Sequence, residues 1–87
     1  MKAKPRAKTD NPIVLELAKR IKDLRIKQGY TNYEYFAYEN NVSRTQYGRY
    51  ERGEDIRFTS LFKVVNALGV TLEEFFRDFE KEINQEP

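Results

Sequence analysis

Three arginines and one threonine lie close together between positions 44 and 52. Together with Gly48, the residues Arg44, Thr45, Arg49 and Arg52 are spaced so that they share one face of an α-helix. An arginine can donate two parallel hydrogen bonds, which match the O6 and N7 acceptors of guanine in the major groove of DNA. A generic solvated helix face usually mixes both signs of charge, whereas this face carries no acid. We therefore interpret it as a surface that reads DNA.

The composition excludes most catalytic chemistry. The 87 residues include no cysteine and no histidine, which removes the thiol nucleophile, the thiolate ligands of zinc and the commonest general base. No glycine-rich phosphate loop and no convergent pair of carboxylates is present either. We expect a binding protein that is not an enzyme and that uses no cofactor and no metal.

Apolar residues are too dispersed for a membrane protein. No apolar run approaches the ~20 residues that a spanning helix needs, and the N-terminus lacks the apolar segment of a secretory signal. The absence of cysteine is also compatible with a reducing cellular compartment. We expect no membrane contact and a cytoplasmic location.

The net charge of +2 is unevenly distributed along the chain. Residues 1–72 carry 14 basic and 8 acidic side chains, and residues 73–87 carry 2 basic and 6 acidic ones. Lys2, Lys4, Arg6 and Lys8 lie in a segment without acids and with few apolar residues. We expect residues 1–10 to form a flexible basic arm that favours a polyanion, with a plain solubilising tail as an equally open alternative.

The apolar periodicity predicts five helices and no strand around the arginine face. Two short helices, about 32–39 and 43–52, are joined by a tight turn, as in a helix-turn-helix unit. The first helix of such a unit braces against the DNA backbone, and the second lies in the major groove. Tyr47 and Tyr50 then face inward from the second helix. We expect an all-α, compact five-helix bundle whose DNA-binding domain covers residues 11–78, followed by an acidic extension of the last helix at 79–87.

Local signals delimit the five helices. The first begins at Pro12 and ends before Gly29. Its apolar stripe consists of Ile13, Leu17, Ile21 and Leu24, with Val14 and Ala18 beside them. Polar residues are expected to cap the helix starts: Asn11, Thr31 or Asn32, Ser43, Thr59 and Thr71. The last helix is expected to present an apolar side made of Phe75, Phe76, Phe79 and Ile83.

The chain resembles the Cro/C1-type helix-turn-helix family, also called XRE, over roughly residues 13–76. The resemblance rests on the order and spacing of several motifs: Ile21-x-x-Leu24-Arg25, Tyr33-x-x-Phe36-Ala37, Val42-Ser43, Tyr50-Glu51-Arg52-Gly53 and Leu68-Gly69-Val70-Thr71-Leu72-Glu73-Glu74-Phe75-Phe76. It implies a lambda-repressor-like bundle that binds operator DNA, usually as a symmetric dimer. It also implies a regulator of transcription, such as a small stand-alone repressor or a controller-like protein.

The same resemblance implies roles for individual residues. The base-reading positions of the family fall on Arg44, Thr45 and Arg49, and Gln46 and Gly48 stand where some members touch DNA. Further residues are expected to contact phosphates: Tyr33, Asn32, Ser43, Arg52, Arg57 and Thr59. Tyr33 replaces a frequent Gln of the family, Asn41 its turn glycine, and Asn40 an apolar residue.

Arg25 and Glu51 stand where the family commonly forms a salt bridge. A carboxylate that faced phosphate would be repelled, so we favour this structural role for Glu51 over a DNA contact or acid catalysis. Glu54 and Asp55 could pair with Arg52 and Arg57 in the loop that follows.

Two features leave alternatives open. Gly48 lies inside a helix, where glycine costs about 1 kcal/mol of stability relative to alanine. Three explanations for this glycine stay open: close approach to DNA, close approach to a neighbouring helix, and chance.

Phe79 and Ile83 are candidates for a dimer interface or for a site that binds a partner protein. The alternative function is therefore a protein-interaction module, such as an antitoxin-like chain that uses its C-terminal aromatic helix.

Overall fold

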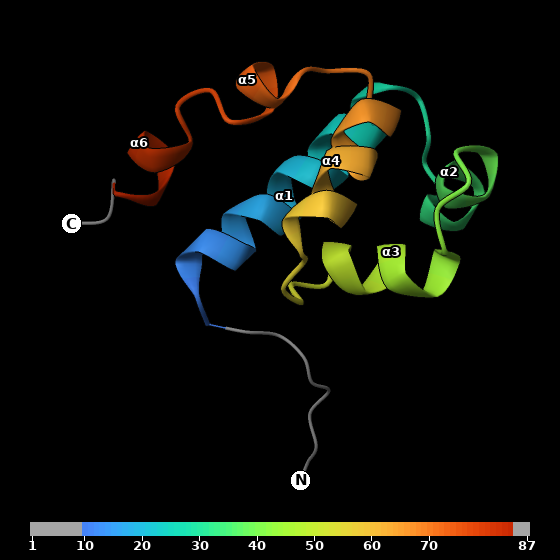
Figure 1. Ribbon diagram of the computed structural model, residues 1–87, viewed down its shortest axis with the longest axis horizontal. Coiled ribbons are helices and arrows are strands. Elements are labelled where there is room, and N and C mark those ends of the chain that lie inside the picture. The colour runs from blue at the N-terminus through green and yellow to red at the C-terminus, as the bar shows by residue number, and fades with distance from the viewer. Residues whose placement is uncertain (1–9, 85–87) are drawn as a thin grey trace, which may run out of the picture.

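The structure, a computed structural model, describes residues 10–84 as a bundle of helices (Figure 1). The elements are α1 Pro12–Lys27, α2 Tyr33–Glu39, α3 Arg44–Glu51, α4 Phe58–Ala67, α5 Leu72–Phe75 and α6 Phe79–Ile83. No strand occurs within these described residues, which agrees with the all-α class that the sequence predicts. The arm residues Lys2, Lys4, Arg6 and Lys8 lie outside the described part of the chain.

The core is built by α1, α2, α3 and α4, with Phe75 of α5 closing one side. Its most deeply buried side chains are Ile21, Phe36, Tyr47, Val64, Val65 and Phe75. The buried stripe of α1 runs through Val14, Leu17, Ala18 and Ile21, and Ile13 is 51% exposed. Our expectation that Ile13 belongs to this stripe is therefore wrong. The stripe begins one residue later, and its next inward position is taken by Arg25.

Side-chain caps set the starts of four helices. The Asn11 side chain accepts a hydrogen bond from the Ile13 N–H at 2.8 Å, and Asn32, not Thr31, accepts one from Tyr35 at 3.0 Å. Ser43 Oγ accepts from the Gln46 N–H at 3.3 Å. At the start of α5 both halves of the capping box are present between Thr71 and Glu74. These polar side chains satisfy N–H groups that a helix start leaves without a partner.

The start of α4 differs from the prediction. Arg57 occupies the cap position with extended backbone and no side-chain cap bond, and its carbonyl accepts from Ser60 and Leu61 at 3.0 Å. The helix consequently begins at Phe58, and Thr59 lies in its first turn instead of capping it. The prediction of a Thr59 cap is wrong.

The expected fifth helix is divided into α5 and α6. Asp78 has a left-handed backbone conformation with φ of 59°, which breaks the helix between the two parts. The guanidinium of Arg20, on α1, donates hydrogen bonds to the carbonyls of Phe75 at 2.7 Å and Arg77 at 2.8 Å. Arg20 therefore satisfies carbonyl groups at the end of α5, and this contact from a distant part of the chain favours the break.

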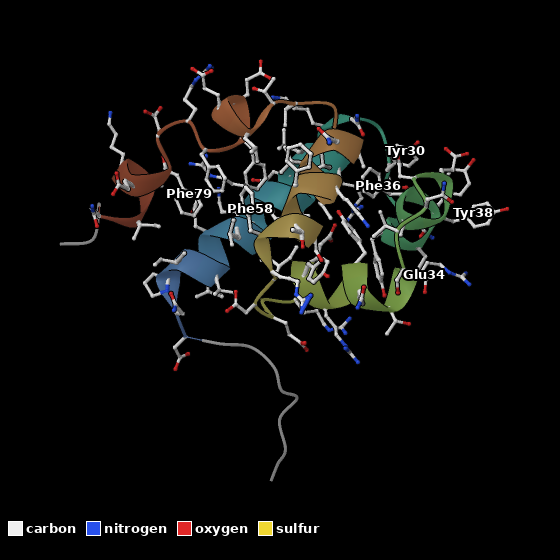
Figure 2. The ribbon with its side chains drawn as sticks, in the orientation of Figure 1. Tyr30, Glu34, Phe36, Tyr38, Phe58 and Phe79 are labelled. Carbon is white, nitrogen blue, oxygen red and sulfur yellow. The ribbon has the colours of Figure 1, made fainter. Side chains whose placement is uncertain are left out.

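Phe79 packs against its own chain. Its ring lies on the side of α6 that faces α1 (Figure 2), 5.1 Å from the Arg20 guanidinium carbon and 5.1 Å between ring centroids from Phe76. Ile83 is half-buried and lines a groove with Pro12 and Leu15 of α1. Contacts with the rest of the chain thus cover Phe79 and Ile83 in part, and their role in an interface stays a prediction.

Candidate nucleic-acid interface

The helix α3 lies at the edge of the molecule, with the other helices on one side of it (Figure 1). Tyr47 is its anchor: the side chain is 0% exposed, and its ring centroid lies 5.2 Å from that of Phe36 and 6.2 Å from that of Tyr33. Tyr50 is half-buried beside the core. The inward face that the sequence predicts is thus occupied by Tyr47 and Tyr50.

The outward face of α3 is polar and exposed. Its exposed residues are Arg44, Thr45, Gln46, Arg49 and, at the end of the helix, Arg52. Four of these five are the side chains whose spacing predicts a common face. The structure therefore places three guanidinium groups, a hydroxyl and an amide on the solvent side of one short helix, where they can donate hydrogen bonds to an external ligand.

Gly48 does not belong to this outward face. It is buried beneath Tyr33 of α2, and a Cβ atom added at Gly48 would lie 2.9 Å from both Cε1 and the hydroxyl oxygen of Tyr33. We therefore correct the assignment of Gly48 to base reading, because its Cα faces α2. A signal was present in the sequence: Glu51, expected to pair with α1, lies three residues later and so on the same side of the helix.

Arg25 and Glu51 form the expected ion pair between α1 and the last turn of α3. Arg25 Nε lies 2.9 Å from Glu51 Oε2, and Arg25 Nη2 lies 2.8 Å from Glu51 Oε1. Arg25 Nη1 also donates to the carbonyl of Tyr30 at 2.8 Å. The side chains are only 5% and 8% exposed, and the hydrogen bond to Glu51, partly opposed by burial, raises the pKa of Arg25. This pair holds α3 against α1.

The hydroxyl of Tyr47 is buried close to this pair. Among the described residues it has no hydrogen-bond partner. Burial, and then the nearby Glu51 carboxylate, raises the pKa of Tyr47. The phenol therefore stays neutral and acts as part of the core.

A polar groove of about 560 Å³ separates the end of α3 from the start of α4. Its lining includes Gln46, Arg49, Arg57 and Ser60, together with Glu54. Glu54 Oε1 lies 4.0 Å from Arg49 Nε, so Glu54 pairs with Arg49 and not, as the sequence suggested, with Arg52 or Arg57. Arg57 is exposed beside the first turn of α4, whose N–H groups have no side-chain cap. Such a helix start favours an anion.

The other expected phosphate contacts lie on the surface around α3. Asn32, Ser43, Arg52 and Thr59 are exposed, and Tyr33 is half-buried. Asn32 and Ser43 already act as helix caps, so each has a structural task independent of any ligand.

Sequence reasoning left one feature unexplained, the polar residue Asn40, and missed another, the exposed phenylalanines of α4. Asn40 donates from its amide to the carbonyl of Phe36 at 2.9 Å, which explains a polar residue at this position. Phe58 and Phe62 on α4 are 60% and 46% exposed. Their spacing of four residues, off the stripe of Leu61 and Val64, could have revealed an outward apolar patch.

Residues 10–84 hold neither a metal-binding cluster nor a membrane-spanning helix. No group of three or more acidic, histidine or cysteine side chains in this part of the chain lies close enough to hold a metal ion. None of its helices is both long and apolar enough to cross a bilayer.

Known proteins are similar to this chain in sequence and in the arrangement of their helices. The model of the helix-turn-helix family matches residues 21–75. Control protein C.MunI from a Mycoplasma species is 34% identical to this chain over 73 residues, which cover 83% of this chain and 99% of that protein. The crystal structure of a tyrosine-to-phenylalanine variant of the restriction-modification controller protein C.Esp1396I is similar, with a TM-score of 0.72, 28% identity and coverage of 84% of this chain and 97% of that chain. The chain belongs to the helix-turn-helix family, in the XRE type of DNA-binding transcriptional regulators that its sequence resembles.

Proposed function

We propose that this protein binds a specific operator in double-stranded DNA through the outward face of α3 and so regulates transcription. One observation carries the proposal: Arg44, Thr45 and Arg49 are exposed together on an edge helix whose opposite face is anchored in the core by Tyr47. A helix anchored in this way can enter the major groove without disturbing the bundle.

The residues around α3 divide into two groups by task. Base edges are read by Arg44, Thr45, Gln46 and Arg49. Phosphates are contacted by Tyr33, Asn32, Ser43, Arg52, Arg57 and Thr59, with the basic arm of residues 1–10 reaching along the duplex. Phosphate contacts set the position of the protein on the DNA, and base contacts give the specificity.

The regulated genes are those of a restriction-modification system. This inference is supported by the names of the two similar proteins, one a control protein and the other a restriction-modification controller protein. A regulator of this kind works where the DNA is, in the cytoplasm of a bacterium, and it needs no catalytic group.

We infer that the protein acts as a homodimer through α4. Phe58 and Phe62 are large, apolar and exposed, and they are one helical turn apart, so they form a small continuous patch. A symmetric pair of such patches would place two α3 helices in successive major grooves, about one helical turn of DNA apart. Phe79 is a poorer choice because it packs on Arg20 and Phe76 of its own chain.

A salt series with duplex DNA of random sequence tests DNA binding itself. Each phosphate contact made by a basic side chain contributes about −0.9 to the slope of log affinity against log salt concentration. We expect a slope that corresponds to several contacts, followed by enrichment of one sequence in a selection from a random library. Binding that is absent at low salt, or a selection without enrichment, would contradict the proposal.

A further inference from the structure

We propose that Tyr33 and Gly48 are a matched pair: the glycine leaves room for the tyrosine ring on the backbone of α3, and the ring holds its hydroxyl as a phosphate donor beside the base-reading face. Gly48 is thus a positioning residue for DNA binding although it touches no DNA. This inference rests on the proposed function and deepens it.

The contact between the two residues is close. A Cβ atom at Gly48 would lie 2.9 Å from Tyr33 Cε1, 2.9 Å from its hydroxyl oxygen and 3.1 Å from Cζ. These three atoms are the outer end of the tyrosine ring. In proteins a Cβ atom essentially never lies closer than 3.0 Å to such a heavy atom of another residue. An alanine at Gly48 would therefore displace the ring of Tyr33.

The backbone at Gly48 does not itself require glycine. The other three glycines, Gly29, Gly53 and Gly69, have positive φ angles, whereas Gly48 lies within the regular helix α3. Glycine destabilises the interior of a helix relative to alanine. The structure therefore explains the glycine at position 48 by the space that the Tyr33 ring occupies beside it.

The Tyr33 hydroxyl is free to bind an external acceptor. No other described residue forms a hydrogen bond with it, whereas the neighbouring Tyr30 hydroxyl donates to Glu39 at 2.8 Å. The ring of Tyr33 lies close to Gly48 and to the ring of Tyr47, both on α3. Gly48 lies four residues, about one helical turn, after Arg44 along α3, so the hydroxyl over Gly48 lies about one turn along the helix from a base-reading arginine. A phosphate oxygen is the acceptor that DNA presents there.

A double-mutant cycle tests the pairing, with duplex affinity and thermal unfolding as the two readouts. Gly48→Ala should lower affinity about tenfold and lower the melting temperature, because the displaced ring disturbs α2 against α3. With Tyr33→Ala already present, Gly48→Ala should not lower affinity further and should raise the melting temperature, because alanine favours a helix. The same effect of Gly48→Ala in both backgrounds would overturn the pairing.

Tyr33→Phe removes the hydroxyl donor but keeps the ring that packs on α3. It should lower affinity about tenfold, as expected for one hydrogen bond to a charged group, without changing the melting temperature or the salt slope, because no cation is lost. Tyr38→Phe is the matched control, since Tyr38 is 71% exposed and points away from the bundle (Figure 2). An unchanged affinity of Tyr33→Phe would overturn the role of the hydroxyl. If the wild-type protein bound no DNA, the proposed function would fail, and the melting temperatures alone would still decide whether Tyr33 and Gly48 are paired.

Discussion

Tyr47 places a hydroxyl in the centre of the core, beside the ion pair of Arg25 and Glu51. The side chain is 0% exposed, and its oxygen has no hydrogen-bond partner among the described residues. A buried hydroxyl without a partner costs about 1–3 kcal/mol. The ring of Tyr47 therefore stabilises the bundle by its contacts with Phe36 and Tyr33, whereas the oxygen opposes folding.

Replacement of Tyr47 by phenylalanine should leave the free energy of unfolding unchanged or raise it by up to about 1 kcal/mol. The substitution keeps the ring contacts and removes only the unsatisfied oxygen. Urea unfolding followed by circular dichroism measures the difference. A loss of more than about 1 kcal/mol would show that the hydroxyl donates a strong hydrogen bond to Glu51 in solution.

Removal of Glu51 should be far more damaging than removal of an exposed acid. Glu51→Ala leaves Arg25 buried and without its carboxylate, which is expected to cost about 3–5 kcal/mol. Asp23→Ala is the matched control, because the Lys19–Asp23 pair on α1 is more than 60% exposed at both side chains and should contribute less than about 1 kcal/mol. Similar unfolding free energies for the two variants would refute a stabilising role for the buried pair.

At the scale of helices, the sequence predicted well what is decided locally. Caps at Asn11, Ser43 and Thr71 lie where polar residues precede an apolar period, and the structure has them there. The division of the last helix was not predictable from local signals, because it involves hydrogen bonds from Arg20 to carbonyls 55 and 57 residues away. The apolar periodicity of the sequence does not reveal tertiary contacts of this kind.

The candidate site also has some features that follow from the local sequence and others that depend on tertiary contacts. The exposed arginine face of α3 follows from spacing alone, since a helix places residues three to four apart on one side. The burial of Gly48 does not follow, because the ring that covers it belongs to Tyr33 on another helix. The pairing of Glu54 with Arg49 likewise depends on how the loop after α3 turns back.

The cap of α2 offers a test at this scale, because two adjacent residues were both candidates. Asn32→Ala removes the acceptor of the Tyr35 N–H and should lower the free energy of unfolding by about 1 kcal/mol. Thr31→Ala should change it by less than about 0.5 kcal/mol, as for an ordinary surface position. Chemical denaturation of both variants checks the order. An equal loss in the two would mean that Asn32 is not the cap in solution.

In the whole molecule, the arginine face and the exposed phenylalanines lie on different helices. The arginine face is on α3, and the exposed phenylalanines are on α4. A dimer formed through α4 leaves both α3 helices free, which is what a two-fold symmetric operator requires. The N-terminal basic arm, outside the described residues, would add charge to this DNA-binding assembly.

Substitution of both Phe58 and Phe62 by lysine should therefore convert the dimer to a monomer. Lysine puts charge into an interface that has to lose water, while the folded chain tolerates it at these exposed positions. Ile26→Lys is the control, because Ile26 is 47% exposed on α1. Sedimentation equilibrium should find a dimer for the wild type and the control. A wild type that stays monomeric, or a dimer that survives the double substitution, would contradict this interface.

Reading of DNA by α3 is tested by measuring base discrimination at the selected operator, one base pair at a time, for the wild type and three arginine variants. Arg44→Ala and Arg49→Ala should each weaken binding by about 1–3 kcal/mol and each lose discrimination at particular base pairs. Arg77→Ala removes the same charge from an exposed position beyond α5 and should keep the full pattern of discrimination. If Arg44→Ala and Arg49→Ala also kept that pattern, α3 would not read the operator.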